Sequence, residues 1–270
     1  MDYQKILDMH THTDNSYDGN HSTMFLCENA VEKGLRAVAF TDHLEMDFYH
    51  EKHFDRTAVQ SFFEISKARS AFRGQLIVCV GVELGQPLYN QEESEALLAR
   101  MPYDFVIGSV HNLRGMEDFF LLKYEEHDID KLLREYFDEL AAMADWARFD
   151  TLAHMTYPLR YIVGDHKIPV DLTQYATQID EVLRLLVLRG KALEINTAGL
   201  RYKIGETSPG EALVRRFREL GGKYLTIGSD AHYAEHLGMG IREGMAIAER
   251  CGFSEITLYQ NREPVQIPIQ

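Results

Sequence analysis

The segment Leu35-Arg36-Ala37-Val38-Ala39-Phe40-Thr41 is short and almost continuously apolar, and Asp42-His43 follows it directly. Strands of this kind are typical of a parallel sheet whose two faces are both covered. Similar runs recur along the chain with longer amphipathic stretches between them, and this alternation favours an α/β fold with a parallel sheet. The strands that we expect span residues 5–10, 35–41, 76–83, 105–111, 151–154, 192–196 and 224–229.

The amphipathic stretches predict helices. The stretch 22–33 begins at Ser22, a residue type that caps helix N-termini, and Gly34 after it favours a stop. Seven strand–helix units without a linker or a repeat suit one barrel domain over residues 1–270 better than an open sheet. The helices that we expect span 22–33, 56–73, 129–147, 172–189, 209–220 and 240–250, and the tail 256–270 would cover the sheet or add an edge strand.

The composition excludes several classes of protein. The chain has 28 Lys and Arg against 42 Asp and Glu, so its formal net charge is −14, which disfavours a polymeric nucleic-acid partner. No apolar run reaches the ~18 residues of a membrane span, and residues 1–5 lack the layout of a signal peptide. Cys27, Cys79 and Cys251 form no closely spaced pair, so we expect a reduced, cytoplasmic protein without disulfides.

Histidines and carboxylates gather at the C-terminal ends of the expected strands. The HxH pair at His10 and His12 places two side chains on one face of a strand, which suits one metal ion. Because these strand ends meet on one face of a barrel, we expect a metal site with zinc, iron or manganese, and little proton competition near pH 7. The residues are His10, His12, His43, Glu83, His111, His154, Asp230 and His232, with Asp18 in the first loop.

The ordered set resembles the polymerase-and-histidinol-phosphatase (PHP) superfamily over nearly the whole chain. The matching residues are HxH, Thr41-Asp42-His43, Glu83, His111, His154 and Ser229-Asp230-Ala231-His232. The resemblance implies a distorted (β/α)7 TIM-like barrel that holds two to three divalent metal ions. It assigns His10, His12, Glu83 and Asp230 to the first ion, Glu83, His111 and His154 to the second, and Asp18, His43 and His232 to the third.

Local motifs narrow the resemblance. The segment Leu193-Glu194-Ile195-Asn196-Thr197-Ala198-Gly199-Leu200-Arg201 resembles the sixth-strand motif of L-histidinol-phosphate phosphatases, and residues 41–45 fit them too. This implies hydrolysis of L-histidinol phosphate in histidine biosynthesis, through a metal-bridging hydroxide that attacks phosphorus. Arg201 and Arg160 are the candidates for binding phosphate, because guanidinium matches its geometry, and His43 is a further substrate-binding candidate.

Other roles and functions remain open from the sequence. Asp230 or His232 would protonate the leaving group, and Asp8 and Asp42 would orient neighbouring imidazoles. A related phosphoesterase could act on a small nucleotide such as a nucleoside 3′,5′-bisphosphate. A non-catalytic metal-binding protein is disfavoured, because nine ligands cannot saturate three ions as a structural site requires. The remaining histidines are interpreted as loop residues: His21, His50, His53, His127, His166 and His236.

Overall fold

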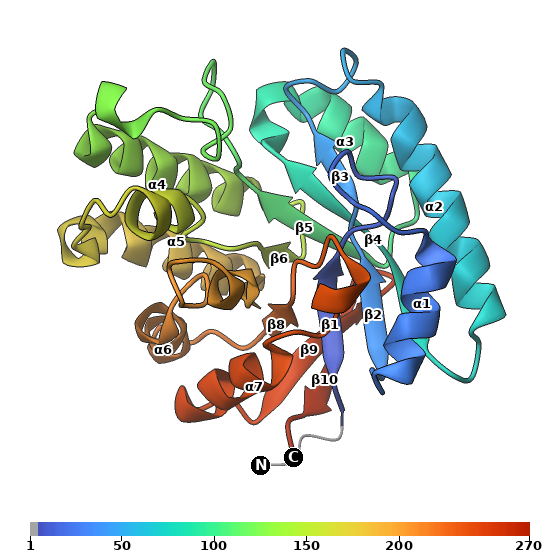
Figure 1. Cartoon of the computed structure of the whole chain (residues 1–270). Coiled ribbons are helices and arrows are strands. Elements are labelled where there is room, and N and C mark those ends of the chain that lie inside the picture. Colours follow the sequence, from blue (N-terminus) through green and yellow to red (C-terminus); the bar gives the residue numbers. More distant parts are fainter. Residues whose placement is uncertain (1–4) are drawn as a thin grey trace.

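The computed structural model describes residues 5–270, and it shows a parallel sheet that curls into a barrel (Figure 1). Residues 1–4, on which part of the expectation about a signal peptide rests, lie outside the described residues. The sheet runs in the order β1-β2-β4-β5-β6-β7-β8, and β3 pairs with β4. The bounds are β1 (Leu7–Thr11), β2 (Ala37–Phe40), β3 (His43–Glu45), β4 (Ile77–Gly85), β5 (Phe105–Ser109), β6 (Thr151–Leu152), β7 (Ala192–Asn196) and β8 (Leu225–Gly228).

The first and last strands close the barrel at their C-terminal ends. The amide of Asp230 donates to the carbonyl of His10 (2.8 Å), and the amide of His12 donates to the carbonyl of Ala231 (2.9 Å). Thr11 and Ala231 also form an isolated parallel bridge. The barrel and its seven expected strands are therefore confirmed, and the ends that carry the candidate ligands meet on one face.

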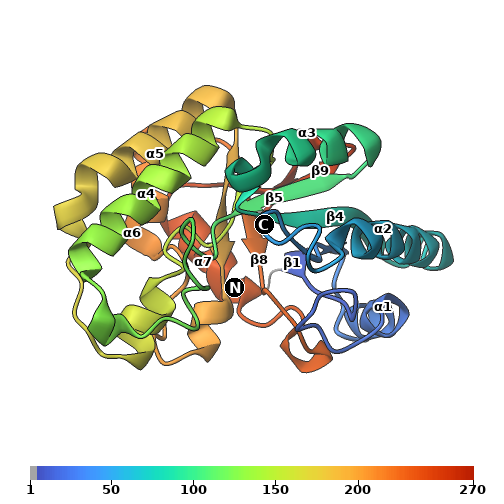
Figure 2. The same cartoon turned by 90° about the horizontal axis from the view of Figure 1, so that it is seen from above.

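Helices surround the barrel, as the view from above shows (Figure 2). The N-cap predicted at Ser22 is confirmed, because its side chain accepts a hydrogen bond from the amide of Phe25. Helix α3 was not predicted. It buries only Ser94 and Leu97, and such a weak apolar stripe gives little signal in the sequence. The bounds are α1 (Thr23–Glu32), α2 (Phe54–Ala71), α3 (Gln91–Arg100), α4 (Ile129–Trp146), α5 (Ala176–Arg189), α6 (Glu211–Glu219) and α7 (Ile241–Arg250).

The tail covers the N-terminal end of the barrel. It folds into an antiparallel hairpin of β9 (Glu255–Gln260) and β10 (Glu263–Pro268). The ring of Tyr259 stacks on Phe105 with 5.1 Å between centroids, and its hydroxyl donates to the carbonyl of Asp150. The expected cover is therefore confirmed. No helix within residues 5–270 has the length and hydropathy to cross a bilayer.

Candidate metal centre

The HxH pair at the end of β1, with His10 in the strand and His12 just after it, faces two carboxylates. Nε2 of His10 lies 3.1 Å from Oε2 of Glu83 on β4 and 3.8 Å from Oδ1 of Asp230. Nε2 of His12 lies 3.5 Å from the same Glu83 oxygen and 3.4 Å from the same Asp230 oxygen. Alternate residues of a strand share a face, so both rings enter the barrel mouth together. The structure thus brings together the four residues that the sequence analysis assigned to a first ion.

Glu83 faces the second predicted group with its other oxygen. Its Oε1 lies 3.2 Å from Nε2 of His111 and 2.9 Å from Nε2 of His154. These two nitrogens are 3.4 Å apart. Both histidines lie two residues beyond their strands, β5 and β6, rather than at the last strand residue. Because each carboxylate oxygen of Glu83 faces a different group, this side chain lies where a bridging ligand would lie.

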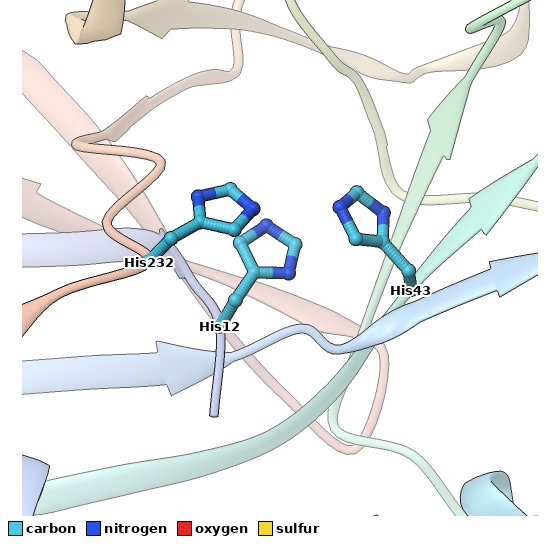
Figure 3. Close-up of side chains that lie close together, drawn as sticks. All are labelled: His12, His43 and His232. Atoms are coloured by element: carbon cyan, nitrogen blue, oxygen red, sulfur yellow. The ribbon is translucent and has the colours of Figure 1, made fainter. Parts of the chain in front are cut away.

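The third predicted group adjoins the first. Oδ2 of Asp18 lies 3.2 Å from Nε2 of His232, and its Oδ1 lies 3.7 Å from Nε2 of His43. The ring of His12 lies between the two imidazoles, with its centroid 4.1 Å from that of His232 and 4.2 Å from that of His43 (Figure 3). The nine candidate ligands therefore form one continuous cluster. His43 begins β3 instead of ending β2, which corrects its expected position.

Several buried imidazole nitrogens of the cluster have no hydrogen-bond partner among the described residues. They are Nε2 of His12, Nδ1 of His43, Nδ1 of His154 and Nε2 of His232. A buried polar atom without a partner costs roughly 1–3 kcal/mol, and native proteins leave few of them. Imidazole and carboxylate donors are those that zinc and similar divalent ions prefer. The residues present therefore fit a metal centre.

Proton affinity differs among the imidazoles of the metal-free chain. Burial opposes a charge on His111, but Glu45 and Glu83 raise the pKa of its ring to about 10. Burial also opposes a charge on His10, but the surrounding carboxylates raise its pKa well above the ordinary value. Burial and nearby imidazoles lower the pKa of His12 to about 3. The expectation of little proton competition is therefore wrong for His10 and His111, because buried carboxylates stabilise their protonated forms.

Comparison with known proteins identifies the family. The chain matches the PHP domain family over residues 8–198, which include seven of the nine candidate ligands. The chain belongs to the PHP domain family. The remaining two candidate ligands of this PHP domain, Asp230 and His232, lie beyond the matched range and are placed in the cluster by the closure of β8 against β1.

Relatives of the PHP domain match it over almost their full length. A probable histidinol-phosphatase from Thermotoga maritima is 30% identical over 254 residues, covering 94% of this chain and 95% of the relative. A histidinol-phosphatase from Lactococcus lactis is 29% identical over 262 residues, covering 94% of each. A crystal structure of histidinol phosphate phosphatase from Lactococcus lactis, complexed with zinc, L-histidinol and phosphate, has a TM-score of 0.80 and 25% identity, covering 97% of this chain and 99% of that one.

A buried glutamate on β7 holds part of the cluster of the PHP domain, and the sequence analysis assigned it no role. Oε1 of Glu194 lies 2.7 Å from Nδ1 of His10, and its Oε2 accepts a hydrogen bond from the amide of His154 (2.8 Å). Gly228 makes this approach possible, because a Cβ there would lie 2.6 Å from Oε1 of Glu194 and 2.3 Å from Cβ of His10. Glu194 therefore links its own strand, β7, to His10 on β1 and to His154 after β6.

A second glutamate without a predicted role lies on β3. Oε1 of Glu45 lies 3.0 Å from Nδ1 of His111 and 3.3 Å from Nδ1 of His43. Burial opposes the charge, but the two histidines lower the pKa of Glu45 to about 2. The sequence did carry a signal for this residue, because His43 and Glu45 have the same two-residue spacing as the HxH pair.

Among the described residues, Asp8 forms no hydrogen bond with an imidazole, which departs from the expectation, whereas Asp42 reaches the ring of His12 through Ser16. Asp8 accepts hydrogen bonds from the amide (2.8 Å) and the hydroxyl (2.5 Å) of Ser229. Oδ1 of Asp42 accepts one from the hydroxyl of Ser16 (3.1 Å), which itself lies 3.1 Å from Nδ1 of His12. The hydroxyl groups of short loop side chains donate hydrogen bonds to these carboxylates. The carboxylates therefore hold in place the backbone that carries the candidate ligands.

Both candidate arginines lie beside Asp230 at the edge of the cluster. Nη2 of Arg160 lies 3.3 Å from Oδ2 of Asp230, and Nη2 of Arg201 donates to the carbonyl of Asp230 (3.1 Å). Nη1 of Arg201 is buried and has no hydrogen-bond partner among residues 5–270. The Arg160 guanidinium also lies over the rings of Tyr157 (5.2 Å) and Tyr202 (4.6 Å). A donor of Arg201 is thus available to a ligand next to the candidate metal centre.

The backbone at Asp230 has a left-handed conformation, with φ of 54°. Asp tolerates this region of backbone conformation better than most residues, and such conformations concentrate at functional sites.

The six other histidines lie in loops or short 3-10 turns, as expected. Among the described residues, the groups that could hold a metal do not include His21, His50, His53, His127, His166 or His236.

Proposed function

We propose that this PHP domain is a metal-dependent phosphomonoester hydrolase that converts L-histidinol phosphate to L-histidinol and phosphate. The observation that carries the proposal is that nine candidate ligands, Glu83 among them, form one cluster at the barrel mouth, with a free donor of Arg201 beside them. The relatives named histidinol-phosphatase, and the similar structure with zinc, L-histidinol and phosphate, support it.

The proposed ligands form three sets, of which the first two share Glu83. They are His10, His12, Glu83 and Asp230; Glu83, His111 and His154; and Asp18, His43 and His232, for two to three divalent ions. The zinc in the similar structure supports zinc over iron or manganese here. Such ions, when bound, lower the pKa of water toward ~7 and neutralise charge on the phosphoryl group. Phosphate monoesters are among the slowest compounds to hydrolyse without a catalyst, so the site must stabilise the negative charge of the phosphoryl group strongly.

The two arginines would bind the phosphoryl oxygens. Nη1 of Arg201 has an unused hydrogen, and a phosphate oxygen would satisfy it with a charge-assisted hydrogen bond. Arg160 is held against Asp230 and two tyrosine rings, so its guanidinium needs little reorganisation to meet a second oxygen. His43 lies at the same mouth and would complete the contacts to the substrate.

We assign proton delivery to the leaving oxygen to Asp230 and His232. Nδ1 of His232 lies 3.6 Å from Oδ1 of Asp230 and 3.1 Å from its carbonyl oxygen. The His232 side chain is 22% exposed and that of Asp230 only 7%, so solvent reaches His232 more readily. His232 would therefore supply the proton directly or through water, while Asp230 would orient it.

The proposal also covers the domain and its location. Residues 1–270 would form one PHP phosphoesterase domain, because the tail hairpin packs against the N-terminal end of the same barrel. The three cysteines are free and buried, which supports the reducing environment of the cytoplasm.

Phosphate release from two substrates tests the proposal. The protein loaded with zinc should hydrolyse L-histidinol phosphate far faster than adenosine 3′,5′-bisphosphate at equal concentration. The opposite order would assign the domain to a nucleotide, and no release from either substrate would contradict a phosphatase. A zinc-free sample, prepared with a chelator and then reloaded, is the control for dependence on metal.

A further inference from the structure

Glu45 reaches its partners because of the register between β3 and β4. His43 pairs with Glu83, and Glu45 pairs with Gly85. On the other side of β4, Gly85 pairs with Ser109 at the end of β5. A side chain that extends from β3 to His111, just after β5, must therefore pass over Gly85.

Gly85 leaves the space for this crossing. A Cβ at Gly85 would lie 2.0 Å from Oε2, 2.7 Å from Cδ and 3.0 Å from Oε1 of Glu45. These three nearest atoms form the Glu45 carboxyl group, so a side chain at position 85 would displace that group first. Gly85 has no positive φ, so alanine would fit its backbone without strain.

The carboxylate of Glu45 divides its two oxygens between ligands and scaffold. Its Oε1 faces Nδ1 of His111 at 3.0 Å and Nδ1 of His43 at 3.3 Å. Its Oε2 accepts a hydrogen bond from Nε2 of Gln86 (2.9 Å). Gln86 in turn accepts a hydrogen bond from the amide of His111 (3.0 Å). The residue is 6% exposed, so these contacts are made away from bulk solvent.

We propose that Glu45 is a positioning residue that couples the second and third metal positions, and that Gly85 makes this coupling possible. An acceptor at Nδ1 holds the hydrogen there, so that Nε2 is free to bind a metal ion. Oε1 of Glu45 is within hydrogen-bond distance of Nδ1 of His111 in the second set. The same oxygen lies 3.3 Å from Nδ1 of His43 in the third set, where Oε2 of Glu83 lies at 3.0 Å, and both charges favour a hydrogen on that nitrogen. The inference rests on the ligand sets of the proposed function.

The first metal position has a different supporting carboxylate. Nδ1 of His10 is held by Glu194 at 2.7 Å, and within residues 5–270 Glu45 forms no hydrogen bond or ion pair with His10 or His12. Loss of Glu45 should therefore weaken two positions and leave one intact. A general loss of structure would weaken all three together.

Zinc titration of the chelator-stripped full chain tests the proposal. We expect Glu45→Gln to keep one zinc equivalent at wild-type affinity and to bind the remaining zinc roughly 10–100-fold more weakly, as loss of such a partner typically does. Glu194→Gln should weaken the equivalent that Glu45→Gln keeps. Asp47→Asn removes a nearby charge that accepts from Asn112 (2.9 Å) and, more distantly, from Gln86 (3.4 Å), and its amide oxygen can keep an acceptor there; this matched control should bind zinc as the wild type does.

Gly85→Ala provides a second route to the same loss. It should reproduce the zinc titration of Glu45→Ala, and the double variant should match Glu45→Ala alone, because the two changes act on one interaction. Additive losses in the double variant would overturn the role of Gly85. Wild-type zinc binding by Glu45→Gln, or equal weakening of all equivalents, would overturn the coupling.

The proposed function can fail independently of this inference. Zinc titration uses no substrate, so a wild-type protein that fails to hydrolyse L-histidinol phosphate can still show the predicted pattern. A wild-type protein that binds no zinc would contradict the ligand sets and the coupling together. Thermal unfolding of each metal-free variant shows whether a loss of zinc reflects a loss of fold.

Discussion

The two ends of the barrel both bury carboxylates, but they surround them with different partners. At the N-terminal end, Oδ2 of Asp104 accepts hydrogen bonds from a strand amide (2.9 Å) and from Nη1 of Arg69 (2.8 Å). Oδ2 of Asp150 likewise accepts from a strand amide (2.8 Å) and from Nε of Arg262 (2.5 Å). Backbone amides and arginines always carry a hydrogen to donate, so the buried carboxylates at this end have their hydrogen-bond partners within the chain.

At the C-terminal end the carboxylates face imidazoles instead. Glu83 is fully buried and is surrounded by His10, His43, His111 and His154. Imidazole can bind a proton or a metal ion, and four nitrogens of the cluster have no hydrogen-bond partner among the described residues. These nitrogens therefore obtain partners only when a proton or a metal ion binds at this end.

The difference separates stability from function. In barrels of this kind the C-terminal face carries the chemistry and the N-terminal face carries stability. Satisfied carboxylates hold the hairpin against the barrel, whereas unsatisfied imidazoles retain a capacity to bind. Substitutions at the two ends should therefore change different measured quantities.

The largest effect is expected from Glu83→Gln at the C-terminal end. The change preserves shape but removes the charge that both metal sets share, so hydrolysis of L-histidinol phosphate should fall by more than roughly 10³-fold, or about 4 kcal/mol. Elemental analysis should show a parallel loss of zinc. Activity within tenfold of the wild type would remove Glu83 from the centre, and circular dichroism would confirm that the variant is folded.

A smaller loss is expected from Arg201→Ala, which removes a phosphate-binding donor but no candidate metal ligand. The value of kcat/KM should fall by roughly 10²-fold, as for other lost donors to a developing charge. Zinc content should stay at the wild-type level. A loss of zinc with the activity would instead make Arg201 a structural support of Asp230.

Zinc affinity should depend on pH by about tenfold per pH unit for each proton displaced. Burial opposes protonation of the His10 and His111 rings, but neighbouring carboxylates raise the pKa of both, that of His111 to about 10. Without metal, both rings therefore carry a proton at pH 7. Zinc must displace these protons, and its affinity should therefore rise as the pH rises from 6 to 8. Calorimetry in buffers of different ionisation enthalpy would count them; no release would refute the protonated cluster.

The smallest effect is expected from Arg262→Ala at the N-terminal end. The Arg262 side chain is 31% exposed, so its loss should lower the free energy of unfolding by about 1–2 kcal/mol, less than for a fully buried pair. Urea denaturation would measure this change. Activity per folded molecule should remain that of the wild type; a selective loss of activity would show that the two ends are not separable.

Much of the candidate centre could be predicted from the sequence because it depends on local features. Continuous apolar runs marked the strands, and the position of each ligand at a strand end placed it on one face of the barrel. The HxH pair needed only the two-residue period of a strand. Prediction failed at α3, whose apolar stripe is weak, and at the role of Asp8, whose partners are Ser229 and the amide of Gly238.

The sequence by itself thus determined the barrel, the candidate ligands and the kind of ion they suit, since these follow from residue type and spacing. Only the tertiary structure decided that Glu45 crosses Gly85 to His111 and that Glu194 holds His10. It also placed the third ligand set against the first through His12. The physical reason is that these contacts depend on strand register and barrel closure, which join residues far apart in the chain.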